Sequence, residues 1–360
     1  MLTSTRNTRT NTYQITIDIN SDSSHLLLEK EKVPYPQSQS YFDEVTIKEN
    51  KIEIVAKRSS IVDLKGIFLN HQSALYRQIT KALIYYYCAT QTPRQIESIK
   101  VQRFGKKKVA QEILGKSDIR QAVSANADLS VLKNINLEAL KLIFSEGEKA
   151  HGYLFSITYL IKSLYADSKH ATFENKWKAF NAIYKAIGGS TTDFACHRFI
   201  REDLIENVPC YPLILNKISK ISVQDIRDNT RWIKFIHNDF STIQKTDAFR
   251  DFILRNEDHR LVEIAKDTIG VRESNLKEKG HYENVTAHLK KHERTVNDPH
   301  LAATICIKYT YFARNKLIHA ENIESGFRLV PLNKEENELT WLSGMLVLLI
   351  IDLINNCKRF

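Results

Sequence analysis

Glycine and proline are both scarce in this chain of 360 residues, which contains 11 and 7 of them. Collagen-like and low-complexity chains need far more of these residues, so the composition excludes both classes. A large all-β fold also needs many turn residues and is disfavoured for the same reason. The phosphate-binding patterns GxGxxG and GxxxxGK[ST] are absent from the sequence. The common nucleotide-binding loops are therefore excluded as a basis for function.

Cysteine is also rare, and the five cysteines, at positions 88, 196, 210, 306 and 357, form no CxxC pair. This spacing disfavours both a disulfide framework and a cysteine-based zinc site, and it suits a reducing compartment. Residues 1–12 lack the apolar stretch of a secretory signal. We therefore expect a cytoplasmic protein with no metal and no cofactor.

Long hydrophobic runs are missing as well. The most apolar one, residues 341–354, is too short to span a membrane and contains Asp352. The sequence predicts a buried core helix there and no membrane partner.

Positive charge is what the sequence has in excess, with 52 Lys and Arg against 42 Asp and Glu and a net charge of +10. Such a balance favours polyanionic partners through long-range attraction. The chain also contains 15 Tyr, 16 Phe and 3 Trp, enough aromatic residues for a sizeable core.

Strand and helix patterns divide the chain into three parts. Apolar residues alternate with polar ones over 13–19 and again on both sides of residues 49–51, which predicts a small β-rich N-terminal region, residues 1–60. Residues 61–145 form a helical linking region in this interpretation, although 97–104 fits a strand or a helix.

Four long helical segments are expected in the third part, residues 146–360. They cover about 148–165, 172–187, 299–321 and 335–357, and a stretch of shorter helices, about 190–298, is inserted between the second and the third. The predicted fold class is mainly α, a helical bundle with a long helical insertion and a small β-rich N-terminal region.

One group of residues in the third long segment carries chemistry. Asn315 and His319 are four positions apart and share a helix face, and the long side chain of Arg314 can reach the same area. A fixed cation, an amide and a titratable imidazole are the groups that RNA cleavage through the 2′-hydroxyl requires.

The pattern R-N-x-x-x-H at 314–319 resembles the signature of HEPN domains. The segment from Phe173 to Tyr184, which contains Trp177, Phe180 and Asn181, is similar to the Trp helix of HEPN proteins of the abortive-infection type. The resemblance covers about 146–189 and 299–357. The family often has Gly after the His, where this chain has Ala320. Some members carry a Tyr two residues after the His, which antitoxins modify; this chain has Glu321 at that position.

This resemblance implies a homodimer in which two Arg/His motifs meet to form one metal-independent endoribonuclease site. Arg314 would stabilise the phosphate, His319 would act as acid or base, Asn315 would orient the pair and Asn181 would support them. The implied role is that of a toxin or anti-phage effector that cleaves RNA, with a regulatory partner or phage trigger. The N-terminal region would sense the trigger or hold the dimer, so residues 146–360 alone would keep activity.

Other interpretations remain open. A looser Arg/His spacing also occurs at Arg231/His237 and Arg294/His300. The motif could equally belong to a non-catalytic RNA- or protein-binding module, or the charge to a DNA-binding regulator. His288 and His292, with His281 upstream, have a spacing that zinc can use, but lysines lie between them. Arg103 with Lys106, Lys107 and Lys108 could contact phosphates or form a solvated surface.

Overall fold

The computed structural model describes residues 11–35, 41–105, 109–318 and 333–360. The chain forms two compact units: one comprises Met1–Tyr165 with Cys357–Phe360, and the other comprises Ala166–Asn356. The sequence predicts boundaries after residues 60 and 145. The unit boundary at 165/166 leaves helix α4 (Glu148–Ser163) with the N-terminal unit.

The N-terminal unit is built on one antiparallel sheet with the strand order β2-β3-β4-β1-β5-β6. Its strands are β1 (Asn11–Ile19), β2 (Leu26–Pro34), β3 (Phe42–Lys48), β4 (Lys51–Arg58), β5 (Ile96–Phe104) and β6 (Val109–Gly115). The first strand of the chain is therefore a central strand, paired on one side with β4 and on the other with β5.

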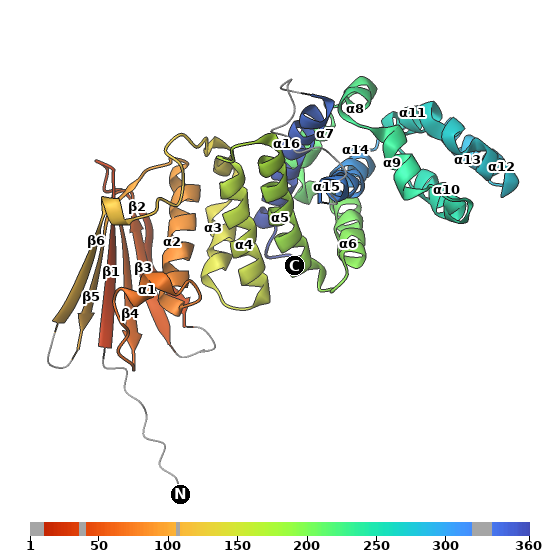
Figure 1. The fold of residues 1–360 in the computed structure, drawn as a ribbon. Helices are drawn as coiled ribbons and strands as arrows, with labels where there is room; N and C mark the ends of the chain where they lie inside the picture. The colour runs from red at the N-terminus through yellow and green to blue at the C-terminus, as the bar shows by residue number, and fades with distance from the viewer. Residues whose placement is uncertain (1–10, 36–40, 106–108, 319–332) are drawn as a thin grey trace, which may run out of the picture. The chain divides into compact units, whose positions relative to one another are not determined.

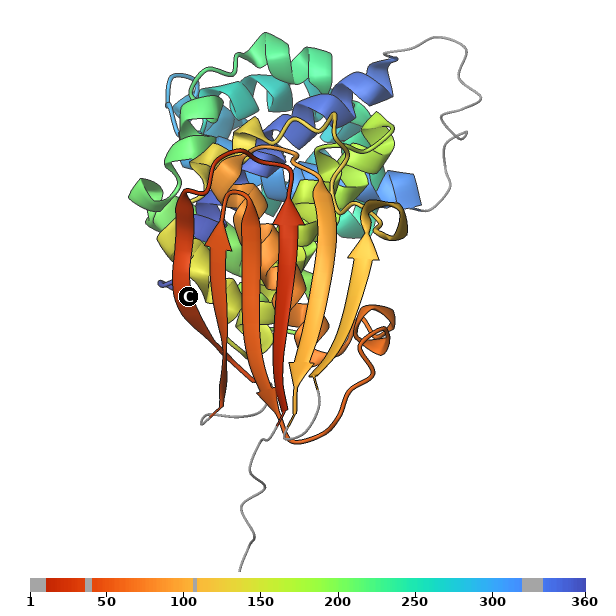
Figure 2. The same ribbon diagram turned by 90° about the vertical axis from the view of Figure 1, so that its left-hand side faces the viewer.

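One face of this sheet is apolar, because buried and half-buried residues alternate along β1. Tyr13, Ile15 and Ile17 are fully buried on that face. Helix α2 (Ala74–Thr90) packs on it, and the opposite face is turned to the viewer in Figure 2 with no drawn element in front of it. The other helices of the unit are α1 (Gly66–Leu69), α3 (Leu137–Leu140) and α4.

The predicted fold class, a mainly α helical bundle with only a small β-rich N-terminal region, is wrong. The sheet continues to residue 115, and two of its six strands lie in the region that we expected to be helical and linking. The reason is local composition: β6 reads Val-Ala-Gln-Glu-Ile-Leu-Gly, in which Ala, Gln, Glu and Leu favour a helix. Pairing with β5 overrides that preference.

The second unit is helical throughout its described residues. Its helices are α5 (Lys169–Gly188), α6 (Asp193–Glu206), α7 (Pro212–Ile218), α8 (Val223–Asn229), α9 (Trp232–Asp239), α10 (Thr246–Leu254), α11 (His259–Thr268), α12 (Glu273–Glu278), α13 (Tyr282–Lys291), α14 (Asp298–Ala303), α15 (Thr310–Ile318) and α16 (Lys334–Asn355). A π-helical turn, Thr304–Tyr309, joins α14 to α15. Helices α5 and α16 pack against each other (Figure 1).

The start of α5 and the turn into α6 follow from the sequence. The Ser168 hydroxyl accepts a hydrogen bond from the Ala171 amide, 3.1 Å away, and caps α5. Gly189 ends the helix with a φ of +58°, a backbone conformation that glycine adopts readily. At Gly188 a Cβ would lie 2.8 Å from the Cys196 Sγ of α6, so only glycine allows the two helices to approach this closely.

Helix α16 contains the apolar run 341–354. Among the described residues it is the one helix that is long and apolar enough to cross a membrane, but 72% of its most apolar 18-residue window is buried. It is a core helix, as expected.

Candidate functional site

Arg314 lies on α15 and is held by two neighbours. Its Nη1 donates a hydrogen bond to the side-chain oxygen of Asn315, 2.9 Å away. Its guanidinium lies over the indole ring of Trp177 on α5, 5.9 Å from the ring centroid, which is a cation–π contact. The structure thus places Arg314 and Asn315 beside the Trp helix, the second segment that resembles HEPN proteins.

Arg314 contacts, through Trp177, a cluster of aromatic rings from α5, α6 and α15. The imidazole of His197 on α6 is its centre: its ring centroid lies 4.6 Å from that of Tyr184 and 5.1 Å from that of Tyr311. Trp177 packs against the same imidazole at 5.9 Å. Since Trp177 and Tyr184 are buried, the rings form a rigid wall beside the guanidinium.

Burial also sets the charge state of His197. Desolvation lowers the pKa of this imidazole to about 4, against the smaller opposing effect of the nearby Asp193 carboxylate. His197 is therefore neutral near pH 7 and cannot act as a general acid there. It can still accept or donate a hydrogen bond with its Nε2.

Three buried nitrogens of this cluster have no hydrogen-bond partner among the described residues. They are Nε of Arg314, Nε2 of His197 and Nε1 of Trp177. Buried polar atoms are almost always paired, because leaving one unpaired costs about 1–3 kcal/mol. Unpaired nitrogens on three helices, one of them on the arginine itself, make this cluster a candidate binding site for an acceptor group.

Asn181 lies one turn after Trp177 on α5, and its side-chain amide donates to the Tyr184 hydroxyl, 2.7 Å away. It is therefore connected to the aromatic cluster through Tyr184. Burial raises the pKa of Tyr184, and the positive charge of Arg314 opposes that shift, which places the tyrosine within the electrostatic reach of the guanidinium.

His319 lies outside the described residues, as do Ala320 and Glu321. It directly follows Ile318, the last residue of α15. The spacing between Arg314 and His319, and the meeting of two motifs in a dimer, therefore stay predictions.

Two tyrosines near the start of α15 have different partners. The Tyr309 hydroxyl bonds to Glu338, and the ring of Tyr311 contacts His197. Both lie in or just after the π-helical turn Thr304–Tyr309 that leads into α15. Such turns occur often at functional sites.

The histidines considered for zinc serve structural contacts instead. His281 Nε2 lies 2.6 Å from an Asp247 oxygen, and His288 Nε2 lies 2.9 Å from the Asn256 carbonyl. The described residues contain no group of three or more His, Cys, Asp and Glu side chains placed to hold a metal ion. Of the basic patch, Arg103 lies in β5, and Lys106, Lys107 and Lys108 lie outside the described residues.

Sequence reasoning did not find His197 or Tyr311. Each is a single ring on its own helix, and nothing in the local sequence shows that the two meet. The one available signal was the aromatic residue three positions before Arg314, on the same helix face.

Comparison of the chain with protein-family models, with curated proteins and with solved structures finds no match in any of the three.

Proposed function

We propose that this protein is a metal-independent endoribonuclease that uses Arg314, Asn315 and His319, as the resemblance to HEPN ribonucleases implies. The observation that carries the proposal is the Arg314 guanidinium, oriented by Asn315 and Trp177 and retaining a buried Nε without a partner in the described chain. A guanidinium fixed in this way is suited to two-point recognition of a phosphate.

The reaction needs no water in its first step. The 2′-oxygen of the ribose forms a bond to phosphorus while the bond from phosphorus to the 5′-oxygen breaks. The proton of the 2′-hydroxyl passes to a base, and the leaving 5′-oxygen takes a proton from an acid. Arg314 stabilises the charge that gathers on the phosphorane oxygens, and His319 supplies the acid or the base. The products are a 2′,3′-cyclic phosphate and a 5′-hydroxyl.

The decisive experiment is cleavage of single-stranded RNA by the purified full chain in EDTA, with identification of the product ends. Wild type should give cyclic-phosphate ends, and His319→Ala should abolish them. His300→Ala is the matched control, since His300 belongs to the looser Arg/His spacing but not to the motif, and it should cleave like wild type. Equal cleavage by wild type and His319→Ala would refute the proposed role of His319.

A homodimer is part of this proposal, since the two-fold arrangement would join two motifs into one site. Light scattering should give twice the mass of one chain, and the specific activity should fall on dilution below the dissociation constant. A monomer with undiminished activity contradicts a composite site.

The biological role that fits such an activity is a toxin or anti-phage effector. Expression of wild type should stop growth of the host cell, and Arg314→Ala or His319→Ala should relieve the arrest at equal protein level.

The unit boundaries also change which fragment should be tested for activity. A fragment that starts at residue 146 keeps α4 (Glu148–Ser163) without the rest of its unit. The helical unit that holds the motif begins at Ala166.

A non-catalytic RNA- or protein-binding module is the second candidate. It is favoured by His197, which lies in the cluster but supplies no acid near pH 7, because burial lowers its pKa to about 4 and the imidazole is neutral there. That module would bind RNA with the same affinity in wild type and His319→Ala and cleave it in neither.

A further inference from the structure

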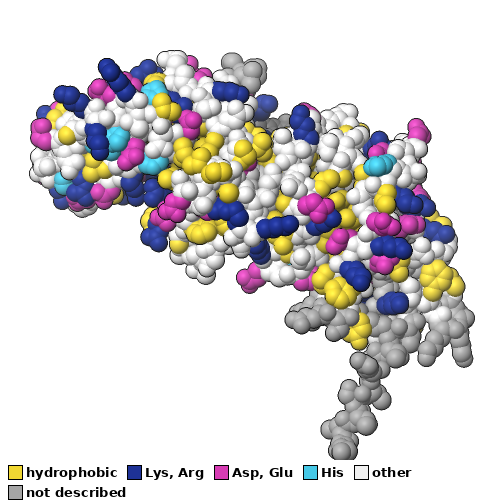
Figure 3. All heavy atoms as spheres, turned by 180° about the vertical axis from the view of Figure 1, so that it is seen from behind, with side chains coloured by type: hydrophobic (Ala, Val, Ile, Leu, Met, Phe, Trp, Pro, Cys, Tyr) yellow, Lys and Arg dark blue, Asp and Glu magenta, His cyan; other side chains and the backbone are white. Residues whose placement is uncertain are grey.

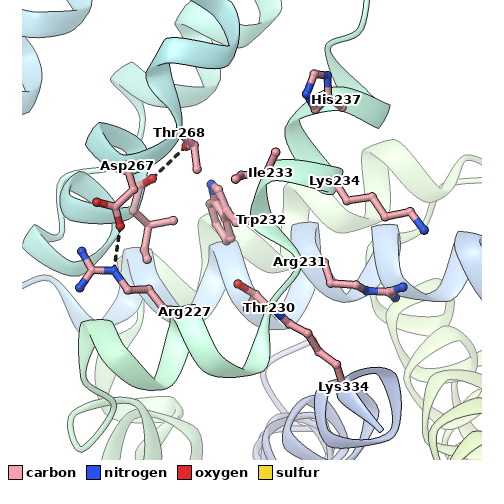
Figure 4. A pocket seen from close by; sticks show the side chains of 11 residues that line it. Arg227, Thr230, Arg231, Trp232, Ile233, Lys234, His237, Asp267, Thr268 and Lys334 are labelled. Atoms are coloured by element: carbon pink, nitrogen blue, oxygen red, sulfur yellow. Dashed lines mark hydrogen bonds and ion pairs between the residues drawn. The ribbon is translucent and has the colours of Figure 1, made fainter.

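On the face drawn in Figure 3, Lys and Arg side chains are mixed with Asp and Glu and form no single basic band. A local excess of positive charge occurs elsewhere in the helical unit, in a cleft of about 560 Å³. The cleft is lined by α8, α9, α11 and the first residue of α16 (Figure 4). Its polar lining includes Arg227, Arg231, Trp232, Lys234, His237 and Lys334.

The lining of the cleft contains four Lys and Arg side chains and one carboxylate, that of Asp267. Arg227 is paired with that carboxylate at 2.8 Å, and Arg231 with the buried Glu338 at 2.6 Å. Lys234 and Lys334 are exposed and make no ion pair within the described chain. Two cations are thus held in place and two are free to bind an incoming anion.

Trp232 forms the floor of the cleft and points to a ligand independently of charge. It is 6% exposed, and its indole ring is stacked on Tyr309 with the ring centroids 5.5 Å apart. Its Nε1–H is buried and has no hydrogen-bond partner among the described residues. A buried donor of this kind requires an acceptor, and here the space beside it is the cleft. Figure 4 shows Trp232 in the middle of the lining side chains.

The cations of the cleft come from separate elements, which suits a strand better than a single phosphate. Arg227 lies on α8, Lys234 on α9 and Lys334 at the start of α16. Cations spread over several elements can contact more than one phosphate of the same backbone. Ile233, which is 53% exposed at the same cleft, offers an apolar surface to a sugar or a base.

We propose that this cleft binds the sugar–phosphate backbone of single-stranded RNA. Lys234 and Lys334 contact phosphates, and the Trp232 indole N–H donates to a phosphate or sugar oxygen. The proposal rests on the proposed function in taking this RNA to be the substrate, but binding in the cleft does not require cleavage. It gives the ribonuclease a second anchoring point that is separate from the Arg314 cluster: Trp232 stacks on Tyr309, whereas Tyr311 of the cluster contacts His197.

The test uses the full chain with His319→Ala, so that the RNA stays intact, in EDTA. Binding of a fluorescein-labelled 12-nucleotide RNA is measured by anisotropy between 50 and 200 mM salt. Lys234→Ala/Lys334→Ala should weaken binding about tenfold or more. It should also reduce the slope of log K against log salt by about 1.4, since each contacted phosphate of a single strand contributes about 0.7.

Lys290→Ala/Lys291→Ala is the matched control, because it removes two exposed lysines from α13, outside the cleft. It should change the affinity less than twofold and leave the slope unchanged. Trp232→Phe removes the N–H and keeps a ring to stack on Tyr309, so it should weaken RNA binding several-fold without shifting the melting temperature much.

Two results would overturn the proposal. One is equal affinity and slope for Lys234→Ala/Lys334→Ala and the control. The other is a loss of binding of AMP or inorganic phosphate in that variant while RNA binding stays unchanged, which would assign the cleft to a free anion. If these variants bind RNA more weakly, as expected, but wild type never cleaves RNA, the cleft is confirmed as an RNA-binding site and the ribonuclease proposal is wrong.

Discussion

The guanidinium of Arg314 and the indole of Trp177 are in face-on contact, 5.9 Å from the carbon of the cation to the ring centroid. The arginine comes from α15 and the tryptophan from the middle of α5, and α5 is fixed by its packing on α16. The contact therefore ties the orientation of the motif to the core of the helical unit. It gives a physical reason why the chain contains both the Arg/His motif and the Trp helix.

Arg314→Lys should reduce RNA cleavage by about 100-fold or more, because an ammonium group keeps the charge but loses the planar fork that binds a phosphate at two points. Initial rates in EDTA measure this. Arg198→Lys, an exposed substitution on α6, is the control and should retain the full rate. A lysine variant with more than half the wild-type rate would show that Arg314 serves only as a positive charge.

His197→Phe should change how stability depends on pH. The folded-state pKa of His197 is about 4, below its ordinary value of 6.5, so its contribution is fully present above pH 6.5 and is lost as the pH falls towards 4. The loss should amount to about 2–3 kcal/mol in the free energy of unfolding, and phenylalanine should abolish it. Urea unfolding of both proteins at pH 7, 5.5 and 4.5 measures the difference, and parallel curves would contradict it.

Asp352→Asn should change the pH dependence of stability in the direction opposite to His197→Phe. Asp352 is 1% exposed, and burial raises its pKa to about 7, although its oxygens accept from the Leu213 and Ile214 amides at 3.3 and 2.9 Å. Its contribution is present below pH 4 and is lost as the pH rises to 7. The asparagine variant should therefore gain stability relative to wild type as the pH increases from 4 to 7. Asp228→Asn, at an exposed position, should follow wild type across this range.

Gly188→Ala should lower the free energy of unfolding by about 1–3 kcal/mol, because the new methyl group would collide with Cys196 and push α6 away from α5. Gly270→Ala is the matched control: nothing lies within 4 Å of a Cβ at that position. Its stability should stay within about 0.5 kcal/mol of wild type. Because α6 carries His197, the Gly188 variant should also lose RNA cleavage, which a simple activity assay checks.

The helices that define the site could be predicted from sequence because their signals are local. The expected segment 172–187 corresponds to α5 (Lys169–Gly188), and 335–357 corresponds to α16 (Lys334–Asn355). Capping residues, a glycine pair and regular apolar spacing mark these helices. We predicted too small a sheet because no comparable local signal marks the ends of β5 and β6. These segments become strands by pairing: β5 pairs with β1 and with β6.

The site could be predicted only along one helix. Arg314 and Asn315 are neighbours in sequence, and their contact followed from the motif. His197 meets Tyr184 and Tyr311 only after α5, α6 and α15 have packed, and the π-helical turn that leads into α15 has no sequence signature that we could use. The cleft around Trp232 likewise depends on elements from four parts of the chain.

The position of β1 in the sheet has a consequence for folding. The hairpin β3–β4 and the paired strands β5–β6 join segments close in sequence, whereas β1 must find β4 and, much later in the chain, β5. Contacts between distant segments form slowly, so β1 is expected to wait for its second partner during synthesis. Until then β1, already paired with β4, presents its other edge unpaired, and non-native strand pairing and aggregation begin at such edges. A chaperone that shields this edge would raise the yield of folded protein, more so at high expression.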